Sequence, residues 1–281
     1  MKIAFLFLTI DNVLFPEIWD YYFRNNYDKI SIYCHPKYPD KVTVPWQKKN
    51  IISNLTSTDW GFLTQATVNL LLASLKNKEN IKFILVSDSC LPIKSFNLFF
   101  NFLKRDNLKT SYIDLYDKDV DLYNFKKSNL PSDFFSYKLR KHSQWFCLSR
   151  YHVKKLLIHS DLNKFKKFFA GDEHILTLII EEKYIKNFDI TFSNWDANKL
   201  KTEKIRKEIE SFFIKKENEK TNKYDKTIKK LRKKRFLLGA HPKIYDKLNQ
   251  NELNEIKESK SFFYRKFSKD SNIIKFYKDI L

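Results

Sequence analysis

The chain has 281 residues, of which 43% are hydrophobic and 16% aromatic. This length allows one large α/β domain or two small ones, and the apolar content excludes an intrinsically disordered chain. The net charge of +20 favours an anionic partner, such as nucleic acid, phosphate groups or an acidic membrane surface.

The N-terminal half predicts an α/β domain. Residues 2–9 form an apolar run typical of a buried strand, residues 15–23 have helical aromatic spacing, and residues 29–35 alternate like a second strand. Such a β-α-β opening indicates parallel strands joined by a right-handed crossover. The same patterns predict further helices and strands, namely helices over 62–75 and 94–105 and strands over 81–86 and 110–114.

The second half is less regular. Residues 115–140 are aromatic without a clear period and predict a surface loop over a site, and a strand over 143–148 and a helix over 150–159 follow. A last strand is predicted over 189–196, and a further helix lies in the C-terminal tail.

A cluster of polar residues, Asp172-Glu173-His174, precedes the apolar run 175–180, which is read as a helix. One interpretation is a helix cap, with Asp172 as the capping residue and Glu173 in the first turn. The other is a catalytic carboxylate, stabilised as an anion by the helix dipole and placed to accept a proton from a hydroxyl group. The cluster alone favours the cap.

Polar residues also follow three predicted strands, at 9–12, 87–89 and 195–196. In open α/β sheets, ligands bind outside the carboxyl ends of the strands. Ser87 and Asp88 therefore suggest nucleotide or sugar contacts, although a simple strand-to-helix turn gives the same pattern.

Several other functions find no support in the sequence. It contains neither a G-x-G-x-x-G motif nor a P-loop, and its His and Cys residues lack zinc spacing. The Asp-x-Asp pairs at 117–121 lie in the irregular region and are weak metal-ligand candidates. Cys34, Cys90 and Cys147 are predicted to be buried thiols in a reducing compartment. The chain has 3 Gly residues, so each is expected to mark a backbone constraint.

Residues 199–236 hold 16 Lys and Arg against 6 Asp and Glu, a net charge of +10 and half that of the chain. Apolar residues recur on one helical face, so this segment is predicted to be a basic amphipathic insertion. It could be a solvated surface or could contact an anionic membrane. Neither a signal peptide nor a membrane span is predicted, so a cytoplasmic protein, peripheral on the membrane in the second case, is expected.

Six motifs occur in an order that resembles one enzyme family. They are 84–93 (ILVSDSCLPI), 143–146 (SQWF), 172–174 (DEH), 194–196 (NWD), 241–242 (HP) and 263–267 (FYRKF). The set resembles the core-2/I-branching β-1,6-N-acetylglucosaminyltransferase family, which includes peptide xylosyltransferases and plant glucuronosyltransferases. The resemblance extends from Lys2 to about Ile274, and the insertion at 199–236 departs from it.

The resemblance implies a single GT-A-type, Rossmann-like domain over residues 1–281, with a central mostly parallel sheet. It implies inverting, metal-independent transfer from a UDP-sugar, with N-acetylglucosamine the favoured sugar, to a glycan or glycolipid hydroxyl. No cofactor is implied. The resemblance implies the general base for Glu173, diphosphate binding for Lys266 and, by spacing from Leu253, for Lys243, and acceptor binding for Trp195. The further candidates are Arg265, Asp88 and Ser87 for donor or diphosphate binding and Asp172 for acceptor binding.

Each role also has an alternative without function: Lys266 and Lys243 could be solvated surface charges, and Trp195 could be a core residue. Two rival functions also remain open, a nucleic-acid-binding protein and a membrane-surface scaffold with an inactive transferase fold. The apolar strands and the confinement of half the excess charge to one insertion disfavour nucleic-acid binding, so no nucleic acid is expected as a partner.

Overall fold

The computed structural model describes residues 1–116, 139–195, 203–205, 207–208 and 241–281. The Asp-x-Asp pairs at 117–121, Asp196 and most of the basic insertion lie outside these ranges. Among the described helices, none is long and apolar enough to cross a membrane.

The centre of the fold is a six-stranded sheet in the order β2-β1-β3-β6-β5-β7. Its strands are β1 (Lys2–Thr9), β2 (Ile30–Pro36), β3 (Asn80–Ser87), β5 (Ser111–Ile113), β6 (Cys147–Ser149) and β7 (Ile185–Asn187). The pairs β2–β1, β1–β3 and β5–β7 are parallel, and β6 runs antiparallel to both of its neighbours. The predicted α/β class with a mostly parallel sheet is confirmed.

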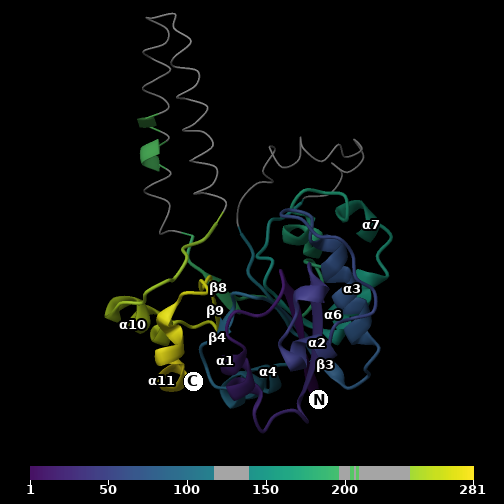
Figure 1. Ribbon diagram of the computed structural model, residues 1–281. Helices are drawn as coiled ribbons and strands as arrows, with labels where there is room; N and C mark the ends of the chain where they lie inside the picture. The colour runs from purple at the N-terminus through teal and green to yellow at the C-terminus, as the bar shows by residue number, and fades with distance from the viewer. Residues whose placement is uncertain (117–138, 196–202, 206, 209–240) are drawn as a thin grey trace, which may run out of the picture.

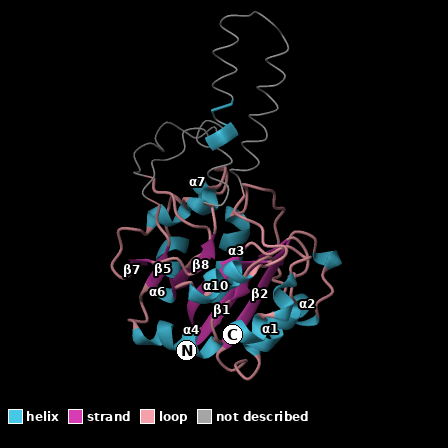
Figure 2. Ribbon diagram, turned by 90° about the vertical axis from the view of Figure 1, so that its left-hand side faces the viewer, coloured by secondary structure: helices cyan, strands magenta, loops and turns pink. Residues whose placement is uncertain are grey.

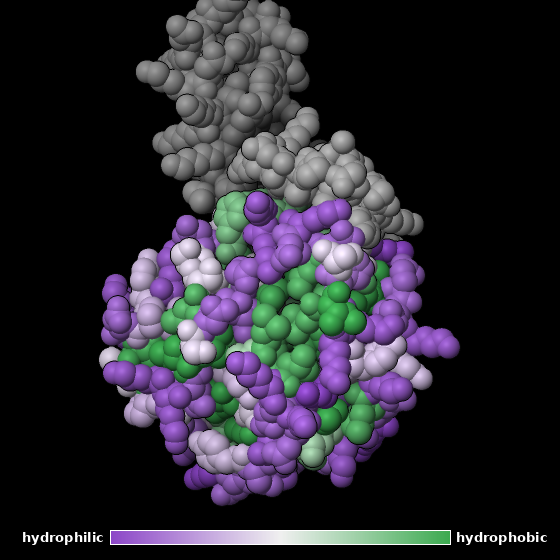
Figure 3. Space-filling model, turned by 90° about the vertical axis from the view of Figure 1, so that its right-hand side faces the viewer, coloured by the Kyte–Doolittle hydropathy of each residue, from purple (hydrophilic) through white to green (hydrophobic). Residues whose placement is uncertain are grey.

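Helices cover both faces of the sheet (Figure 1). The helices α3 (Thr64–Leu75) and α6 (Arg150–Leu157) pack on one face, and α1 (Pro16–Phe23) and α4 (Phe96–Arg105) lie on the other. Shorter helical segments connect these elements: η1 (Pro39–Lys41), α2 (Pro45–Lys49) and α7 (Leu162–Phe165). Apolar side chains gather on the outer face on the side of α3 and α6 (Figure 3).

A second, three-stranded sheet has the order β4-β9-β8 and comes largely from the C-terminal part of the chain. It consists of β4 (Leu91–Pro92), β8 (Thr191–Ser193) and β9 (Phe263–Arg265), and it is accompanied by α10 (Gln250–Glu258), η6 (Asn272–Lys275) and α11 (Tyr277–Ile280). Both chain termini lie at the lower end of the molecule (Figure 2). Because β1 starts there, the carboxyl ends of the parallel strands lie at the opposite end.

An aromatic core joins the two sheets. The Phe5 ring of β1 lies 4.9 Å from Phe23 of α1, and Trp19 stacks on Phe263 of β9 with ring centroids 6.0 Å apart. Burying side chains of this size stabilises the fold by about 1.5–3 kcal/mol each. Because β9 is anchored in this core, the residues that follow Phe263 are held beside the carboxyl ends of β1 and β3.

The predicted helix over 175–180 is wrong. The structure instead has two 3-10 turns, η3 (Gly171–Glu173) and η4 (Ile175–Leu178), separated by His174 with φ −132°. A tertiary contact competes with helix formation, because the Leu176 N–H donates to Nε2 of His142 at 3.0 Å. Without an α-helix, Glu173 gains no macrodipole, so its anionic form has to be stabilised by other groups.

Candidate active site

The predicted polar clusters after β1 and β3 lie together. The Ile10 N–H donates to Oδ2 of Asp88 at 3.2 Å, and the Leu14 N–H donates to the Asp88 carbonyl at 3.0 Å. Ser87 Oγ lies 3.2 Å from Ser89 Oγ and is buried with it. These contacts place Asp88 at the common carboxyl edge of the two strands, where the general rule for open sheets predicts a ligand.

The end of β9 brings two cations to this edge. The Phe267 N–H donates to the Ser89 carbonyl at 3.2 Å, and the Tyr245 N–H donates to the Lys266 carbonyl at 2.9 Å. Burial, and the neighbouring charge of Arg265, lower the pKa of Lys266. Two partly desolvated cations side by side repel each other, so an anion placed between them would be strongly favoured.

Arg265 lies deeper than Lys266. Its guanidinium carbon is 4.4 Å from the centroid of the buried Trp145 ring, and within the described residues its Nε–H is buried without a hydrogen bond. Burial lowers the pKa of Arg265, and nearby acidic groups that include Asp88 and Glu173 partly offset this effect. The guanidinium is therefore oriented by stacking and retains hydrogen-bonding capacity.

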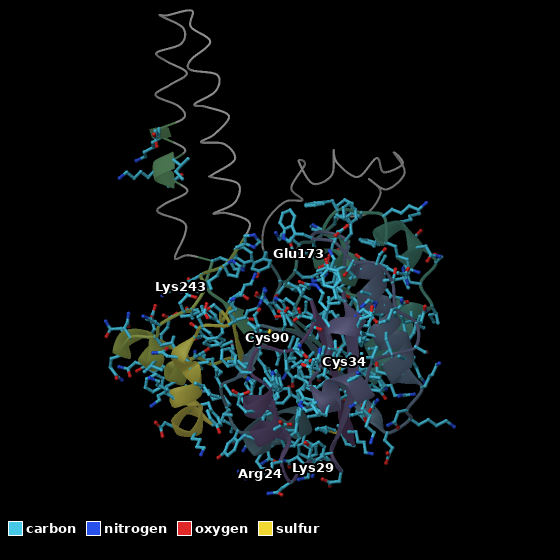
Figure 4. The ribbon with its side chains drawn as sticks, viewed as in Figure 1. Arg24, Lys29, Cys34, Cys90, Glu173 and Lys243 are labelled. Carbon is cyan, nitrogen blue, oxygen red and sulfur yellow. The ribbon has the colours of Figure 1, made fainter. Side chains whose placement is uncertain are left out.

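Glu173 lies on the same side of the molecule as these cations. Its Oε2 is 2.9 Å from Nζ of Lys141, and its side chain is 27% exposed. Its charge acts on the pKa of Arg265, so the two groups lie within electrostatic range of each other. Figure 4 shows Glu173 toward the upper end of the molecule, far from Arg24 and Lys29 at the lower end. The general-base candidate and the diphosphate-binding candidates thus lie in one region.

Lys243 is placed differently from Lys266. Its Nζ is 2.7 Å from Oε1 of Glu252 on α10, and its N–H donates to the Asn194 carbonyl. Burial, the largest single effect, lowers the pKa of Lys243, but the bond to Glu252 together with the charges of nearby acidic groups outweighs it, so the net shift is upward. Because a carboxylate already neutralises its charge, Lys243 is less available to a diphosphate than Lys266, and its predicted role stays a prediction.

Trp195 is 39% exposed, so it does not occupy the core position that was one of its two interpretations. It follows β8 by two residues, and Ser193 of β8 pairs with Arg265 of β9. Because β8 and β9 are parallel, Trp195 lies at the same end of the small sheet as Arg265 and Lys266. Its role in acceptor binding stays a prediction.

Trp60 was not identified from the sequence, yet it bridges the two halves of this region. Its ring centroid lies 5.3 Å from that of Phe169 and 6.1 Å from that of His241, and the residue is 52% exposed. Gly61 fixes this turn: its φ is +83°, and a Cβ there would lie 2.3 Å from the Phe169 ring. The scarcity of glycine in the chain was the available signal for this constraint.

Asp172 is buried beneath Glu173. It is 4% exposed, and its Oδ1 is buried without a hydrogen bond within the described residues. Burial, with a smaller contribution from the Glu173 charge, raises the pKa of Asp172 to about 7. A side chain this deeply buried is poorly placed to touch an acceptor, and its predicted acceptor contact has no support from its position.

Asp172 predicts a pH-dependent stability. The pKa rises from 3.8 to about 7 on folding, so between these values the folded state binds more protons than the unfolded state. The free energy of unfolding should therefore fall as pH rises through this range, by at most about 4 kcal/mol. Urea unfolding at pH 5 and pH 8 measures this change, and Asp172→Asn should reduce it. An identical pH dependence in the variant would contradict the assignment.

A second carboxylate pair, Asp114 and Asp189, lies near the base candidate. Burial and the charge of Asp114 raise the pKa of Asp189 to about 7, and Glu173 acts electrostatically on the neighbouring Tyr116. The described residues contain no group of three or more His, Cys, Asp or Glu side chains that could hold a metal ion. Carboxyl groups such as these can hydrogen-bond hydroxyl groups.

Comparison with known proteins gives three findings. A family model described as Core-2/I-Branching enzyme matches residues 3–217. Glycosyltransferase BC10 from Oryza sativa subsp. japonica is 28% identical over 163 residues, which are 54% of this chain and 39% of that protein. The chain thus spans well under half the length of this curated relative. Among solved structures, that of mouse xyloside xylosyltransferase 1, apo form, is similar to this chain with a TM-score of 0.35 and 12% sequence identity. The aligned part is 69% of this chain and 89% of the xylosyltransferase chain. That structural similarity is too low to support any argument about function.

Proposed function

The chain belongs to the core-2/I-branching enzyme family, and on that premise we propose that it is an inverting glycosyltransferase that uses a UDP-sugar donor. The acceptor is a hydroxyl group of a glycan or glycolipid, and N-acetylglucosamine is the favoured donor sugar. One observation supports this proposal above the others: a partly exposed carboxylate, Glu173, and two adjacent cations, Arg265 and Lys266, occupy one region at the carboxyl edge of the sheet.

Each group has a definite part in the proposed reaction. The acceptor oxygen forms a bond to the anomeric carbon while its proton moves to the Glu173 carboxylate. The bond between the anomeric carbon and the diphosphate oxygen breaks, and UDP leaves with the electron pair. Arg265 and Lys266 stabilise the negative charge that develops on the diphosphate. Arg265 suits this task because its planar fork can bind two phosphate oxygens at once.

The exposed aromatic residues fit the sugar substrates. Trp195 and Trp60 each present a large apolar ring surface at this edge of the molecule, against which sugar C–H groups can pack. Trp60 lies between Phe169, four residues before Glu173, and His241, whose pKa is lowered by burial and by the charges of Lys266 and Arg265. We assign Trp60 to the substrate side of the proposed site on this ground.

Turnover of UDP-sugars tests the proposal. UDP release is measured with a panel of UDP-sugars and candidate acceptors, and donor binding is followed by the shift in Tm that ligand binding produces. A UDP-sugar that raises Tm and is consumed supports the transferase. If no UDP-sugar binds and single-stranded nucleic acid does, the rival nucleic-acid-binding function replaces it. Binding without turnover, together with flotation on anionic liposomes, would indicate the inactive scaffold.

The transfer should not depend on a divalent metal ion. Arg265 and Lys266 already place two positive charges where the diphosphate is proposed to bind, so a metal ion has no required electrostatic part. Activity in EDTA is expected to stay within about twofold of the untreated rate. A loss of roughly tenfold or more that Mn²⁺ or Mg²⁺ restores would contradict the metal-independent assignment.

A further inference from the structure

We propose that Lys141 is a positioning residue that holds the Glu173 carboxylate in its working orientation and keeps it apart from Arg265. The proposal rests on the proposed function, since it concerns the same general base. It names a residue that neither the motifs nor the strand-end rule identifies. The proposal is based on a short segment, residues 140–145, that contacts Glu173 through Lys141 at one end and Arg265 through Trp145 at the other.

The segment fixes both the backbone and the side chain of Glu173. The His142 N–H donates to the Glu173 carbonyl at 2.9 Å, and Nζ of Lys141 lies 2.9 Å from Glu173 Oε2. Within the described residues, Lys141 is the hydrogen-bonding partner of that carboxylate, and no other is found. One oxygen is thus held by Lys141, and Oε1 is left to accept the proton of the incoming hydroxyl.

His142, the residue after Lys141, is fixed by two hydrogen bonds and stays neutral at the pH at which the enzyme is expected to act. His142 Nδ1 lies 2.8 Å from the Ser143 carbonyl, and its Nε2 accepts the Leu176 N–H at 3.0 Å, so the ring is a neutral tautomer with its proton on Nδ1. Burial, chiefly, lowers the pKa of His142 to about 3. The ring therefore joins the 140–145 segment to Leu176, three residues after the base, at every pH at which the enzyme is expected to act.

At its other end the segment reaches the donor cation, because Trp145 stacks on Arg265 at 4.4 Å. Arg265 attracts the Glu173 carboxylate as well. If Glu173 turned to Arg265, the ion pair would remove both the base and a diphosphate contact at once. The Lys141 ammonium, 2.9 Å from Oε2, gives the carboxylate a competing cationic partner.

The surroundings explain why this ion pair should matter more than a surface pair. Glu173 is faced by Lys141 and Arg265, by the buried Asp172, and by Tyr116. Lys141 and Glu173 are 32% and 27% exposed, so both charges are partly desolvated and screened less than those of a fully exposed pair. Removing Lys141 leaves the base with the buried Asp172 carboxyl group and the cation that it must not neutralise as its neighbours.

The experiment compares wild type with three variants by UDP release from the UDP-sugar that wild type consumes. Lys141→Met is expected to lower kcat by about 10- to 100-fold, because small errors in the position of a catalytic group have effects of this size. The KM for the donor and the affinity for UDP should change much less. Lys141→Arg should restore most of the rate. Lys155→Met, which breaks a similar ion pair to Glu182 at 2.8 Å on α6, should behave like wild type.

The split between kcat and KM separates positioning from simple structural support. A misplaced base lowers kcat while the donor still binds, and Lys141→Arg should restore kcat because it returns a cation to the carboxylate. Wild-type kcat in Lys141→Met, or a loss matched by a lower Tm and not restored by Lys141→Arg, would overturn the role of Lys141 alone. If wild type itself turns over no UDP-sugar, the proposed function fails and this proposal fails with it.

Discussion

Glu173→Gln is expected to reduce sugar transfer by roughly 10²- to 10⁴-fold, the range typical of a lost general base, while UDP binding stays close to that of wild type. The amide has nearly the shape of the carboxylate but cannot accept the acceptor proton. UDP affinity should be preserved because Arg265 and Lys266 are unchanged. Initial rates of UDP release and isothermal titration with UDP measure the two quantities separately.

A matched control is available for this variant. Glu182 forms an ion pair with Lys155 at 2.8 Å, much as Glu173 does with Lys141, but it involves no residue of the proposed site. Glu182→Gln should therefore leave the rate of transfer unchanged. If Glu173→Gln kept wild-type activity, Glu173 would lose its role as the base, and Asp114 or Asp189 would be the next carboxyl groups to test.

Lys266→Met should slow transfer by about 2–4 kcal/mol in the barrier, a loss of roughly 30- to 1000-fold, by analogy with the removal of one preorganised donor from an oxyanion site. Its ammonium is partly buried beside Arg265 and so acts in a medium of lower dielectric than water. The same substitution should also weaken UDP binding, since the diphosphate is charged before and after transfer. Titration with UDP and the kinetics of UDP release measure both effects.

Lys243→Met serves as the internal comparison. Its ammonium is bonded to Glu252 at 2.7 Å, so removing it should cost less than about tenfold in rate if Lys266 and Arg265 are the main diphosphate ligands. Equal losses in the two variants would mean that Lys243 leaves Glu252 when the donor binds. A larger loss in Lys243→Met than in Lys266→Met would contradict the assignment of the diphosphate to the end of β9.

The sheet could be predicted from the sequence because its strands are encoded locally. Apolar runs such as 3–8 in β1 and 83–86 in β3 are typical of strands that are buried on both faces of a parallel sheet. The apolar run after Glu173 misled the same reasoning, since it was read as a helix. Its backbone is shaped by tertiary contacts such as the bond from Leu176 to His142, which no local pattern can reveal. The short strand β7 was missed for a similar reason.

Candidate site residues could be selected where a motif marked them and not where distant segments meet. Glu173 and Lys266 were selected from their motifs, and their roles stay predictions; the structure brings these two residues, far apart in the chain, to one region. Lys141 and Trp60 were not selected, because the contacts on which their proposed roles depend are with Glu173 and Phe169, which lie far along the sequence. Lys243 was selected by spacing alone, and spacing could not reveal its bond to Glu252.

The most direct test is a crystal structure of the protein with UDP bound. We expect the diphosphate to contact the side chains of Arg265 and Lys266, with the Glu173 carboxylate facing the β-phosphate across the space that a sugar would fill. Lys141 should still hold the other side of that carboxylate. Electron density for UDP at a surface remote from Arg265 and Lys266, or with Glu173 turned away from the bound nucleotide, would contradict a site in which one base and two cations act on the same sugar.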